Sequence, residues 1–585
     1  MENLIEEKIL SGLNDKQKSI VEDYDENLYV TACPGSGKTR TLTRKIAYNY
    51  NLYPNSSKKI IAITYTSRAA NEIQERLETL GIESGSVWVG TIHQFCLSFI
   101  IRPFGNSSKR VSKGFKIIDE YVSENYLRDC CKQLGIKYEP YNLPNIRLDK
   151  NGELLEIDPA KKKIARLYHK ILVDNREIDF DLILKLSFSI LEKTPINGLI
   201  LAKTIRSIFV DEFQDTSECQ YDILGKISNA NPSIKFLFVG DTDQAIYTSL
   251  GGVAKTKQEL EALMNLTFFQ KQLDGCYRSS QKIINCYSRY QQNSMPITSF
   301  AAWKSEQGTI YYSNKTHKNS LPDEIARIID AELAKGIREE EICIASPRYD
   351  ILAPLITDLK LRLPGINFRS QDIHPIKPDD LNIFYKISFI AFTEIGKRVW
   401  PRKRISSEVI ELFETEYGIL IKDMGVIDLL DLINSFSSTK VNALDLLEEL
   451  IETLLDKLGI SRKIHPKVYE DLQDFLEKAR ERVRKNNLGT SIGSFKNAYE
   501  TKKGINASTI HKIKGEEYHT VIGIGLLKGY IPNWNNVIND QDHGKKEANK
   551  TLYVLMSRAK HNLFLFSETG RTTAKGNPYI PTEFL

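Results

Sequence analysis

Two hydrophobic patterns alternate along the first part of the chain. Short apolar runs rich in β-branched residues recur between stretches whose apolar positions have helical spacing. The short runs lie at 28–30, 59–65, 87–90, 207–210 and 235–240. Continuous apolar runs of this length predict strands buried on both faces. Strands that alternate with helices predict a parallel sheet with crossover helices, so the fold class is expected to be α/β.

The same alternation returns later, which predicts a second α/β unit. Its expected strands include runs at 341–345, 520–525 and 562–566, with a weaker one near 367–369. Two long stretches interrupt the alternation with mostly helical, charged sequence and are interpreted as inserted subdomains. The predicted boundaries are 1–104 with 200–275 for the first unit, 105–199 for its insertion, 276–377 with 496–585 for the second unit, and 378–495 for its insertion.

The amino-acid composition limits the class of protein but does not identify it. With 585 residues the chain is long enough for several domains, and its 41% hydrophobic and 26% charged residues are ordinary for globular protein. The net charge of +5 permits a polyanionic partner. The eight cysteines form no C-x-x-C pair, so no zinc or iron–sulfur site is expected. The acidic start and the lack of a long apolar run predict no signal peptide, no membrane association and a cytoplasmic location.

A glycine-rich stretch follows the first predicted strand and precedes a predicted helix. Strand, glycine-rich loop and helix together predict a phosphate-binding loop, whose backbone N–H groups and helix N-terminus attract phosphate. Lys38 is expected to reach the β- and γ-phosphates, and the Thr39 hydroxyl to bind Mg²⁺. An ordinary glycine-rich turn is the alternative. The loop consists of Ala32, Cys33, Pro34, Gly35, Ser36, Gly37, Lys38 and Thr39.

Polar residues that follow other strands fit the same chemistry. Asp211 and Glu212 end an apolar strand, and buried acids at such a place are costly unless a cation compensates them. We expect Asp211 to hold Mg²⁺ and Glu212 to act as general base on the attacking water. Gln244 follows the next strand and is expected to contact the γ-phosphate and the water. Gln17, near a helix start that Asn14 or Asp15 would cap, is a candidate adenine-reading amide, with a surface glutamine as the alternative.

Other residues suggest contacts with phosphate or bases. Thr64, Tyr65, Thr91 and His93 sit at predicted strand ends, where ligands gather in parallel sheets, although turn chemistry explains them about equally well. Tyr277 and Arg278 lie near the start of the second unit. We expect the ring of Tyr277 to stack on a base and Arg278 to act as an arginine finger on the γ-phosphate. The cationic segment 397–404, which includes Trp400, suits a nucleic-acid backbone with a stacked base. The segment 478–485 is as well explained by a solvated helix face.

These landmarks, in this order, resemble the UvrD/Rep/PcrA family of superfamily-1 DNA helicases over nearly the whole chain. The resemblance rests on ordered motifs rather than on any one of them. The matching segments are Gln17, 32–40, 64–66, 90–93, 210–216, 239–247, 277–279, 509–518 and 553–559.

The resemblance implies two RecA-like domains that face each other across ATP, each with an insertion. It implies catalytic roles for Lys38, Asp211, Glu212, Gln244, Arg278 and Arg558. It implies ATP contacts from Gln17, Ala32–Arg40, Tyr277 and Glu517, and Mg²⁺ contacts from Thr39 and Asp211. The DNA-contacting residues would be Tyr65, Thr66, His93, Tyr247, His511 and, in addition, Trp400. The implied activity is ATP-driven movement along single-stranded or tailed double-stranded DNA, 3′ to 5′.

The sequence also departs from the family pattern. Thr248, Ser249 and Leu250 stand where the family has a glycine, a base-stacking tryptophan and an arginine. These departures leave the ATP-hydrolysis motifs intact and weigh against efficient duplex unwinding. The alternative is a regulatory ATPase that senses DNA ends and nucleotide and switches a partner nuclease. The segment 100–104 resembles the helicase-like subunit of Gabija-type anti-phage systems, which implies a separate nuclease chain as partner and a role in antiviral defence.

Overall fold

The computed structural model divides the chain into two compact units, residues 1–274 and residues 275–585. We describe each unit by itself. The structure describes the chain from residue 2 to 585 with short gaps. The gaps are residues 55, 83–84, 140–141, 150–151, 248–250, 307, 371–373, 380, 397–398, 423, 487, 501–502, 535–540 and 574, and the side chains of residues 2–5, 400, 500 and 541 are also not described.

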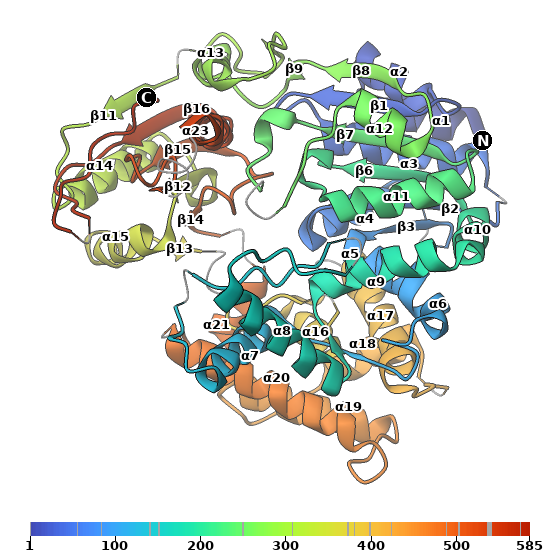
Figure 1. Cartoon of the computed structure of the whole chain (residues 1–585). Helices are drawn as coiled ribbons and strands as arrows, with labels where there is room; N and C mark the ends of the chain where they lie inside the picture. The colour runs from blue at the N-terminus through green and yellow to red at the C-terminus, as the bar shows by residue number, and fades with distance from the viewer. Residues whose placement is uncertain are drawn as a thin grey trace. The chain divides into compact units, whose positions relative to one another are not determined.

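A six-stranded parallel sheet forms the centre of the first unit. The strands follow the order β3-β2-β6-β7-β1-β8, which can be traced in Figure 1. Four of these strands are almost entirely buried, as their continuous apolar sequence predicts. The strands are β1 (Leu28–Ala32), β2 (Lys59–Thr64), β3 (Val87–Thr91), β6 (Ile205–Asp211), β7 (Lys235–Gly240) and β8 (Phe269–Leu273).

Helices surround this sheet and one core cluster joins several of them to it. Residues of α2, α3 and α4 pack with residues of β1, β2 and β7 in that cluster. The helices are α1 (Glu2–Leu10), α2 (Asp15–Glu22), α3 (Lys38–Leu52), α4 (Ser67–Thr79), α5 (Ile92–Cys96), α6 (Arg102–Phe104), α11 (Glu218–Ala230) and α12 (Lys257–Met264).

Between α6 and β6 the chain forms a mostly helical region. It contains α7 (Glu120–Gln133), α8 (Pro159–Asp174), α9 (Phe180–Lys193), α10 (Pro195–Lys203) and the short parallel pair β4 (Lys116–Ile117) and β5 (Glu177–Ile178). Asp119, Asp158 and Asp179 cap the N-termini of α7, α8 and α9 through their side chains. The helical character agrees with the predicted insertion, whose boundaries of 105–199 stay a proposal.

The second unit is built on another six-stranded parallel sheet, in the order β11-β16-β15-β12-β14-β13. Its strands are β11 (Ile310–Ser313), β12 (Ile342–Ser346), β13 (Phe368–Arg369), β14 (Ile505–Thr509), β15 (Tyr518–Gly523) and β16 (Ala559–Phe566). A separate pair joins β9 (Gly275–Cys276) to β10 (Thr298–Ser299). The helices outside the insertion are α13 (Gln281–Tyr287), α14 (Leu321–Ala334), α15 (Tyr349–Arg362) and α23 (Gln541–Met556).

The helical insertion of the second unit has its own hydrophobic core. The core cluster runs from Ile376 to Tyr499, slightly beyond the predicted limits of 378–495, which also stay a proposal. Its helices are α16 (Ile383–Phe392), α17 (Val399–Tyr417), α18 (Val426–Ser435), α19 (Ala443–Lys457), α20 (Pro466–Lys485) and α21 (Ile492–Glu500). Among the described residues, no helix is long and apolar enough to cross a membrane.

The α/β fold class with two parallel sheets is confirmed, but the sequence missed β8 in the first sheet and both β11 and β14 in the second. β14 is mostly buried between β12 and β13, and its polar residues Asn506, Ser508 and Thr509 break the apolar run. β8 and β11 lie at sheet edges. Phe269, Gln270 and Gln272 of β8 are exposed, as are Tyr311 and Tyr312 of β11. Edge strands bury less surface, so they lack the continuous apolar run by which the central strands were recognised.

Candidate nucleotide and DNA sites

The predicted phosphate loop connects β1 to α3 at the carboxyl edge of the first sheet. Gly35 and Gly37 have positive φ angles of 72° and 79°, a conformation that glycine adopts without strain. The loop is tied to the sheet by the N–H of Cys33, which donates to the carbonyl of Leu273 at 2.9 Å. Lys38 begins α3, so its ammonium and the helix N-terminus favour an anion at the same place.

The acid pair follows β6 on the same edge. Asp211 is buried, and Glu212 is held at a φ of 51°. Positive φ at a non-glycine residue costs energy and is often found at functional sites. The Nζ of Lys38 lies 3.5 Å from the Oε1 of Glu212, so the structure brings the phosphate loop and the acid pair together. Burial, together with the charge of Glu212, raises the pKa of Asp211 to about 7.

Two residues that the sequence analysis did not select join this site. Gln214 donates from its Nε2 to Glu212 at 2.5 Å and accepts the N–H of Asp241 at 3.0 Å. Asp241 in turn accepts a hydrogen bond from the Nε2 of Gln244 at 2.7 Å, and burial raises its pKa. Asp241 follows β7 directly, so a polar residue after a buried strand was the signal that could have found it.

The residues present fit a magnesium nucleotide. The Ser36 hydroxyl is buried and has no hydrogen-bond partner among the described residues, as expected of a donor that faces a ligand. The pKa of Asp211 is raised first by burial and then by the charge of Glu212, and a bound divalent cation would stabilise the ionised carboxylate. Thr39 stands beside Lys38 in the first turn of α3, with its side chain half-buried.

Gln17 and Arg40 lie near the loop in different ways. Asn14 is the N-cap of α2, and Gln17 completes a capping box with it. The buried amide of Gln17 also donates to the carbonyl of Ser36 at 3.0 Å, so it supports the loop in this structure. Arg40 is exposed, and its Nη2 lies 3.4 Å from the carbonyl of Ser11.

The predicted arginines of the second unit are held by protein groups. Arg278 donates to Glu517 at 2.9 Å and to the carbonyl of Ser557 at 3.0 Å. Lys560 lies 3.0 Å from the other oxygen of Glu517. Burial alone would raise the pKa of Glu517, but the charges of Arg278 and Lys560 outweigh it and lower the pKa to about 2.

Arg558 is almost fully buried, although it carries a charge. Its guanidinium donates to the carbonyls of Val554 and Glu516, at 3.1 and 3.3 Å, and to the Ser557 hydroxyl at 2.9 Å. These three acceptors hold the buried guanidinium in place. Arg278, Glu517 and Arg558 therefore lie in one region of the second unit, linked through Ser557.

Tyr277 precedes this region on an exposed surface. Its ring is 41% exposed and stacks on Phe300, with ring centroids 5.7 Å apart. An exposed ring that is backed by another aromatic ring offers a flat face to a base.

Two predicted DNA-contacting residues of the first unit form a stacked pair. The rings of Tyr65 and Tyr247 lie 4.8 Å apart at an angle of 22°. Tyr65 is 36% exposed, and burial raises its pKa to about 12. Thr248, Ser249 and Leu250, which follow Tyr247, lie outside the described residues.

Other predicted DNA contacts have local structural roles. The side chain of Thr66 caps α4 by accepting the N–H of Ala69. The ring of His93 packs edge-on against Phe180 at 5.4 Å, and burial lowers its pKa to about 4. His93 is therefore neutral near pH 7 and offers no charge to a phosphate.

The remaining two candidates belong to the second unit. His511 lies in the turn after β14, and its carbonyl accepts the N–H of Lys514 at 3.4 Å. The side chain of Trp400 lies outside the described residues. In the cationic segment around it, Arg402 is buried and donates to Thr393 and Asn434, while Arg404 pairs with Glu408 at 2.8 Å. These two arginines stabilise the helical insertion.

A phosphate loop after β1 and an acid pair after β6 of a parallel sheet define the class of P-loop nucleotide-hydrolysing proteins. Residues 13–265 match the model of the UvrD/REP helicase N-terminal domain, and residues 374–569 match that of the UvrD-like helicase C-terminal domain. The chain belongs to the UvrD-like family of superfamily-1 helicases.

Curated relatives cover nearly the whole chain. The ATP-dependent DNA helicase PcrA of Staphylococcus epidermidis is 23% identical over 644 aligned residues, covering 99% of this chain and 86% of that protein. PcrA of Staphylococcus aureus strain Mu50 is 22% identical with the same coverage of both proteins.

Proposed function

We propose that the chain is an ATP-dependent DNA helicase or translocase that hydrolyses ATP with Mg²⁺ on single-stranded DNA. The observation that carries this proposal is a short connection within the first unit. Gln244 belongs to the network of the acid pair, and Tyr247, three residues later, stacks on Tyr65. Ala245 and Ile246 between them are buried, so a shift at Gln244 displaces Tyr247.

The residues near the loop have distinct roles in the proposed hydrolysis. Lys38 holds the phosphate, and Asp211 and Thr39 hold Mg²⁺, which neutralises charge that develops on the phosphate oxygens. Lys38 neighbours Glu212 at 3.5 Å in the structure. When the ammonium turns to phosphate, Glu212 is released to accept the proton of the attacking water.

The second unit supplies the remaining positive charge in this proposal. Arg278 and Arg558 stabilise the γ-phosphate during transfer, with Glu517 near the ribose and Tyr277 beside the base. Arg278 exchanges its hydrogen bonds to Glu517 and the Ser557 carbonyl for bonds to phosphate. This exchange makes hydrolysis depend on a change in the second unit.

The proposed substrate is single-stranded or tailed double-stranded DNA. The relatives named above are called ATP-dependent DNA helicases, and the stacked pair of Tyr65 and Tyr247 offers the aromatic surface on which bases stack without sequence preference. Movement from 3′ to 5′ is part of the proposal by analogy with the family.

A translocation assay tests this function. Stopped-flow fluorescence on oligonucleotides with a dye at the 5′ or the 3′ end should show ATP-dependent arrival at the 5′ end, with lag times that grow with length. A duplex placed ahead of the protein separates unwinding from movement alone. ATP turnover without any length-dependent arrival would contradict the motor function and favour the regulatory ATPase.

A role in antiviral defence with a partner nuclease stays a prediction. The segment that carried the resemblance to Gabija-type subunits includes Ile100 and Ile101, and both are buried in the helical run after α5. Buried apolar residues pack a core, so this segment does not point to a partner surface. Co-purification of the chain with the product of a neighbouring nuclease gene would support this role.

A further inference from the structure

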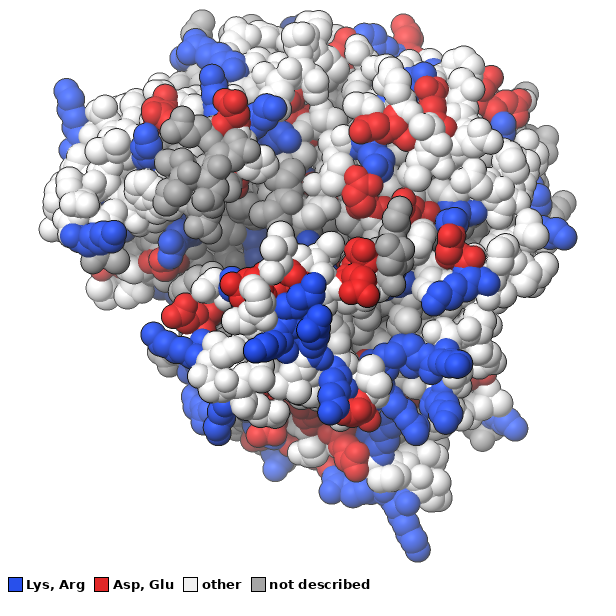
Figure 2. Space-filling model, viewed as in Figure 1, with Lys and Arg blue, Asp and Glu red and all other residues white. Residues whose placement is uncertain are grey.

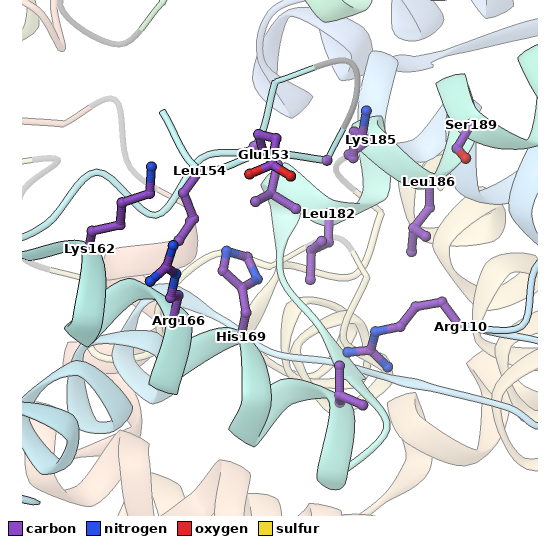
Figure 3. A pocket seen from close by; sticks show the side chains of 13 residues that line it. Arg110, Glu153, Leu154, Lys162, Arg166, His169, Leu182, Lys185, Leu186 and Ser189 are labelled. Carbon is purple, nitrogen blue, oxygen red and sulfur yellow. The ribbon is translucent and has the colours of Figure 1, made fainter. Parts of the chain in front are cut away.

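A pocket of about 440 Å³ lies in the helical region of the first unit, away from the phosphate loop. Helices α8 and α9 contribute most of its lining, together with Leu148 and residues 152–154. Glu153 and Leu154 lie above α8 in the view of Figure 3. A cavity of this size is typical of sites for small organic ligands. None of the residues assigned above to ATP, Mg²⁺ or DNA lines it.

Backbone contacts join residues 147–149 to residues 153–155 beside the pocket. Leu148 and Leu154 form an antiparallel bridge, and the N–H of Asp149 donates to the carbonyl of Glu153 at 2.8 Å. Leu155 donates to the carbonyl of Arg147 at 3.0 Å. Leu148 and Leu154 therefore form one apolar wall, and Leu182 of α9 forms another.

Lysine, arginine and histidine side chains project from one face of α8. Lys162, Arg166 and His169 follow each other at intervals of four and three residues, which places them on one side of a helix. Figure 3 shows all three rising from α8 toward the pocket. The Nε2 of His169 lies 2.7 Å from the carbonyl oxygen of Ile146, which fixes the ring. Lys185 of α9 adds a cation from the other side.

The positive charge in the lining exceeds the negative charge. Of the described residues that line the pocket, Glu153 is the only acidic one, against Arg110, Lys162, Arg166 and Lys185. Among the described residues, Lys162 and Arg166 form no ion pair. Burial lowers the pKa of the Lys185 ammonium. Figure 2 shows Lys and Arg side chains gathered over α8.

We infer that this pocket binds a nucleoside phosphate, with the phosphate on Lys162 and Arg166 and the nucleoside against Leu154 and Leu182. Two adjacent cations suit a phosphate, and leucine walls suit a sugar and base. The same chemistry is available from a free mononucleotide or from the phosphorylated terminal nucleotide of a DNA strand. The inference is independent of the proposed function, since it needs neither hydrolysis nor movement.

The test uses the full chain with Lys38→Ala, so that the phosphate loop contributes little to binding. Isothermal titration with deoxynucleoside monophosphates, with inorganic phosphate, and with a short oligonucleotide with or without a 5′-phosphate measures the affinities. We expect the double variant Lys162→Gln with Arg166→Gln to show one of two results. Either it binds the monophosphate about tenfold or more weakly, or it binds the 5′-phosphorylated oligonucleotide about tenfold or more weakly while the affinity for the monophosphate is unchanged. The first result identifies a free nucleotide and the second a DNA end.

A matched control removes the same charge from the same helix. Lys163→Gln with Lys170→Gln changes two exposed lysines of α8 that do not line the pocket, and affinity should change less than about twofold. Arg166→Lys, which keeps the charge, should retain most of the binding. Equal losses in the two double variants, binding of inorganic phosphate alone, or no binding of any probe would overturn the inference.

Discussion

The two parallel sheets carry opposite and differently balanced charges at their functional edges. In the first unit, burial and the neighbouring charge of Glu212 raise the pKa of Asp211 to about 7, although the ammonium of Lys38 lowers it. In the second unit, Arg278 is balanced by Glu517, whose pKa falls to about 2. The first unit is thus arranged to receive a cation together with phosphate. In the second unit, the guanidinium of Arg278 is already paired with the carboxylate of Glu517.

This difference in charge between the two units explains why nucleotide binding alone need not lead to ATP hydrolysis. A site with two adjacent acids, one of them buried, gains from binding Mg²⁺ together with phosphate, so the first unit is expected to bind nucleotide by itself. The hydrogen bonds that hold Arg278 must be broken before it serves a phosphate. We therefore expect variants of the first unit to lose binding and turnover together, and variants of the second unit to lose turnover alone.

The largest effect is expected from Lys38→Ala. Removal of the ammonium that neutralises phosphate charge should lower ATP turnover about a thousandfold and weaken ATP binding. Steady-state hydrolysis and nucleotide titration measure both quantities. Arg44→Ala is the control, because Arg44 lies on the same helix and donates to the carbonyl of Lys8. Retention of turnover in Lys38→Ala would remove the phosphate loop from the mechanism.

Arg278→Gln is expected to have the next largest effect, and it tests whether the second unit serves turnover without serving nucleotide binding. Turnover should fall about a hundredfold because transition-state charge loses a donor. ATP affinity should change less than about threefold. Arg289→Gln, at an exposed arginine of the same unit, should leave both unchanged. Equal losses of affinity and turnover in Arg278→Gln would show that the two units do not divide these tasks.

Tyr247→Ala should weaken the affinity for DNA and leave the affinity for nucleotide unchanged. Loss of one stacking ring is expected to weaken single-stranded DNA binding about tenfold, since a stacked base contributes about 1–3 kcal/mol. The double variant with Tyr65→Ala should lose less than the sum, because the two rings stack on each other. Fluorescence anisotropy measures the affinities, with the exposed Tyr24→Ala as control. If the double variant loses as much binding free energy as the two single variants together, the two rings do not act as one DNA-binding surface.

The smallest effect concerns His93 and pH. Its pKa is about 4 in the folded chain against about 6.5 in the unfolded chain, so between these values the unfolded state binds more protons. Stability from the neutral ring is present above pH 6.5 and is lost as pH falls toward 4, by about 1–2 kcal/mol at pH 5.5.

Denaturant titrations of the wild type and His93→Gln at pH 5.5 and pH 7.5 test this assignment. The variant should lose less stability than the wild type when the pH is lowered. DNA affinity of the wild type should show no step due to His93 between pH 6 and pH 8. Identical pH dependence of stability in the two proteins would show that His93 is not buried as a neutral ring.

The sequence predicted the parts of the fold that have strong local signals. Central strands such as β2 and β6 are continuous apolar runs, and the loop before Lys38 has glycines where positive φ is required. Edge strands such as β8 escaped notice because their exposed positions break the run. The N-cap Asn14 was among the two residues predicted, since short polar side chains favour that position.

The site was predicted less completely, because several of its contacts depend on tertiary structure. Nothing local distinguishes Gln214 as the link between Glu212 and Asp241, or Glu517 as the partner of Arg278. The charge of Arg402 suggested nucleic acid, but the fold turns it inward to Thr393. Charge patterns in sequence therefore show where cations are, while the structure decides whether a protein group already uses them.

The central claim is that ATP hydrolysis by the first unit is coupled to DNA through Gln244 and Tyr247. The most direct measurement is ATP turnover of the full chain as a function of single-stranded DNA concentration, with Glu212→Gln as the inactive reference. The account predicts that turnover rises at least about tenfold to saturation with DNA, that Tyr247→Ala shifts the midpoint to higher DNA concentration, and that Glu212→Gln stays inactive throughout. Equal turnover with and without DNA in the wild type would contradict it.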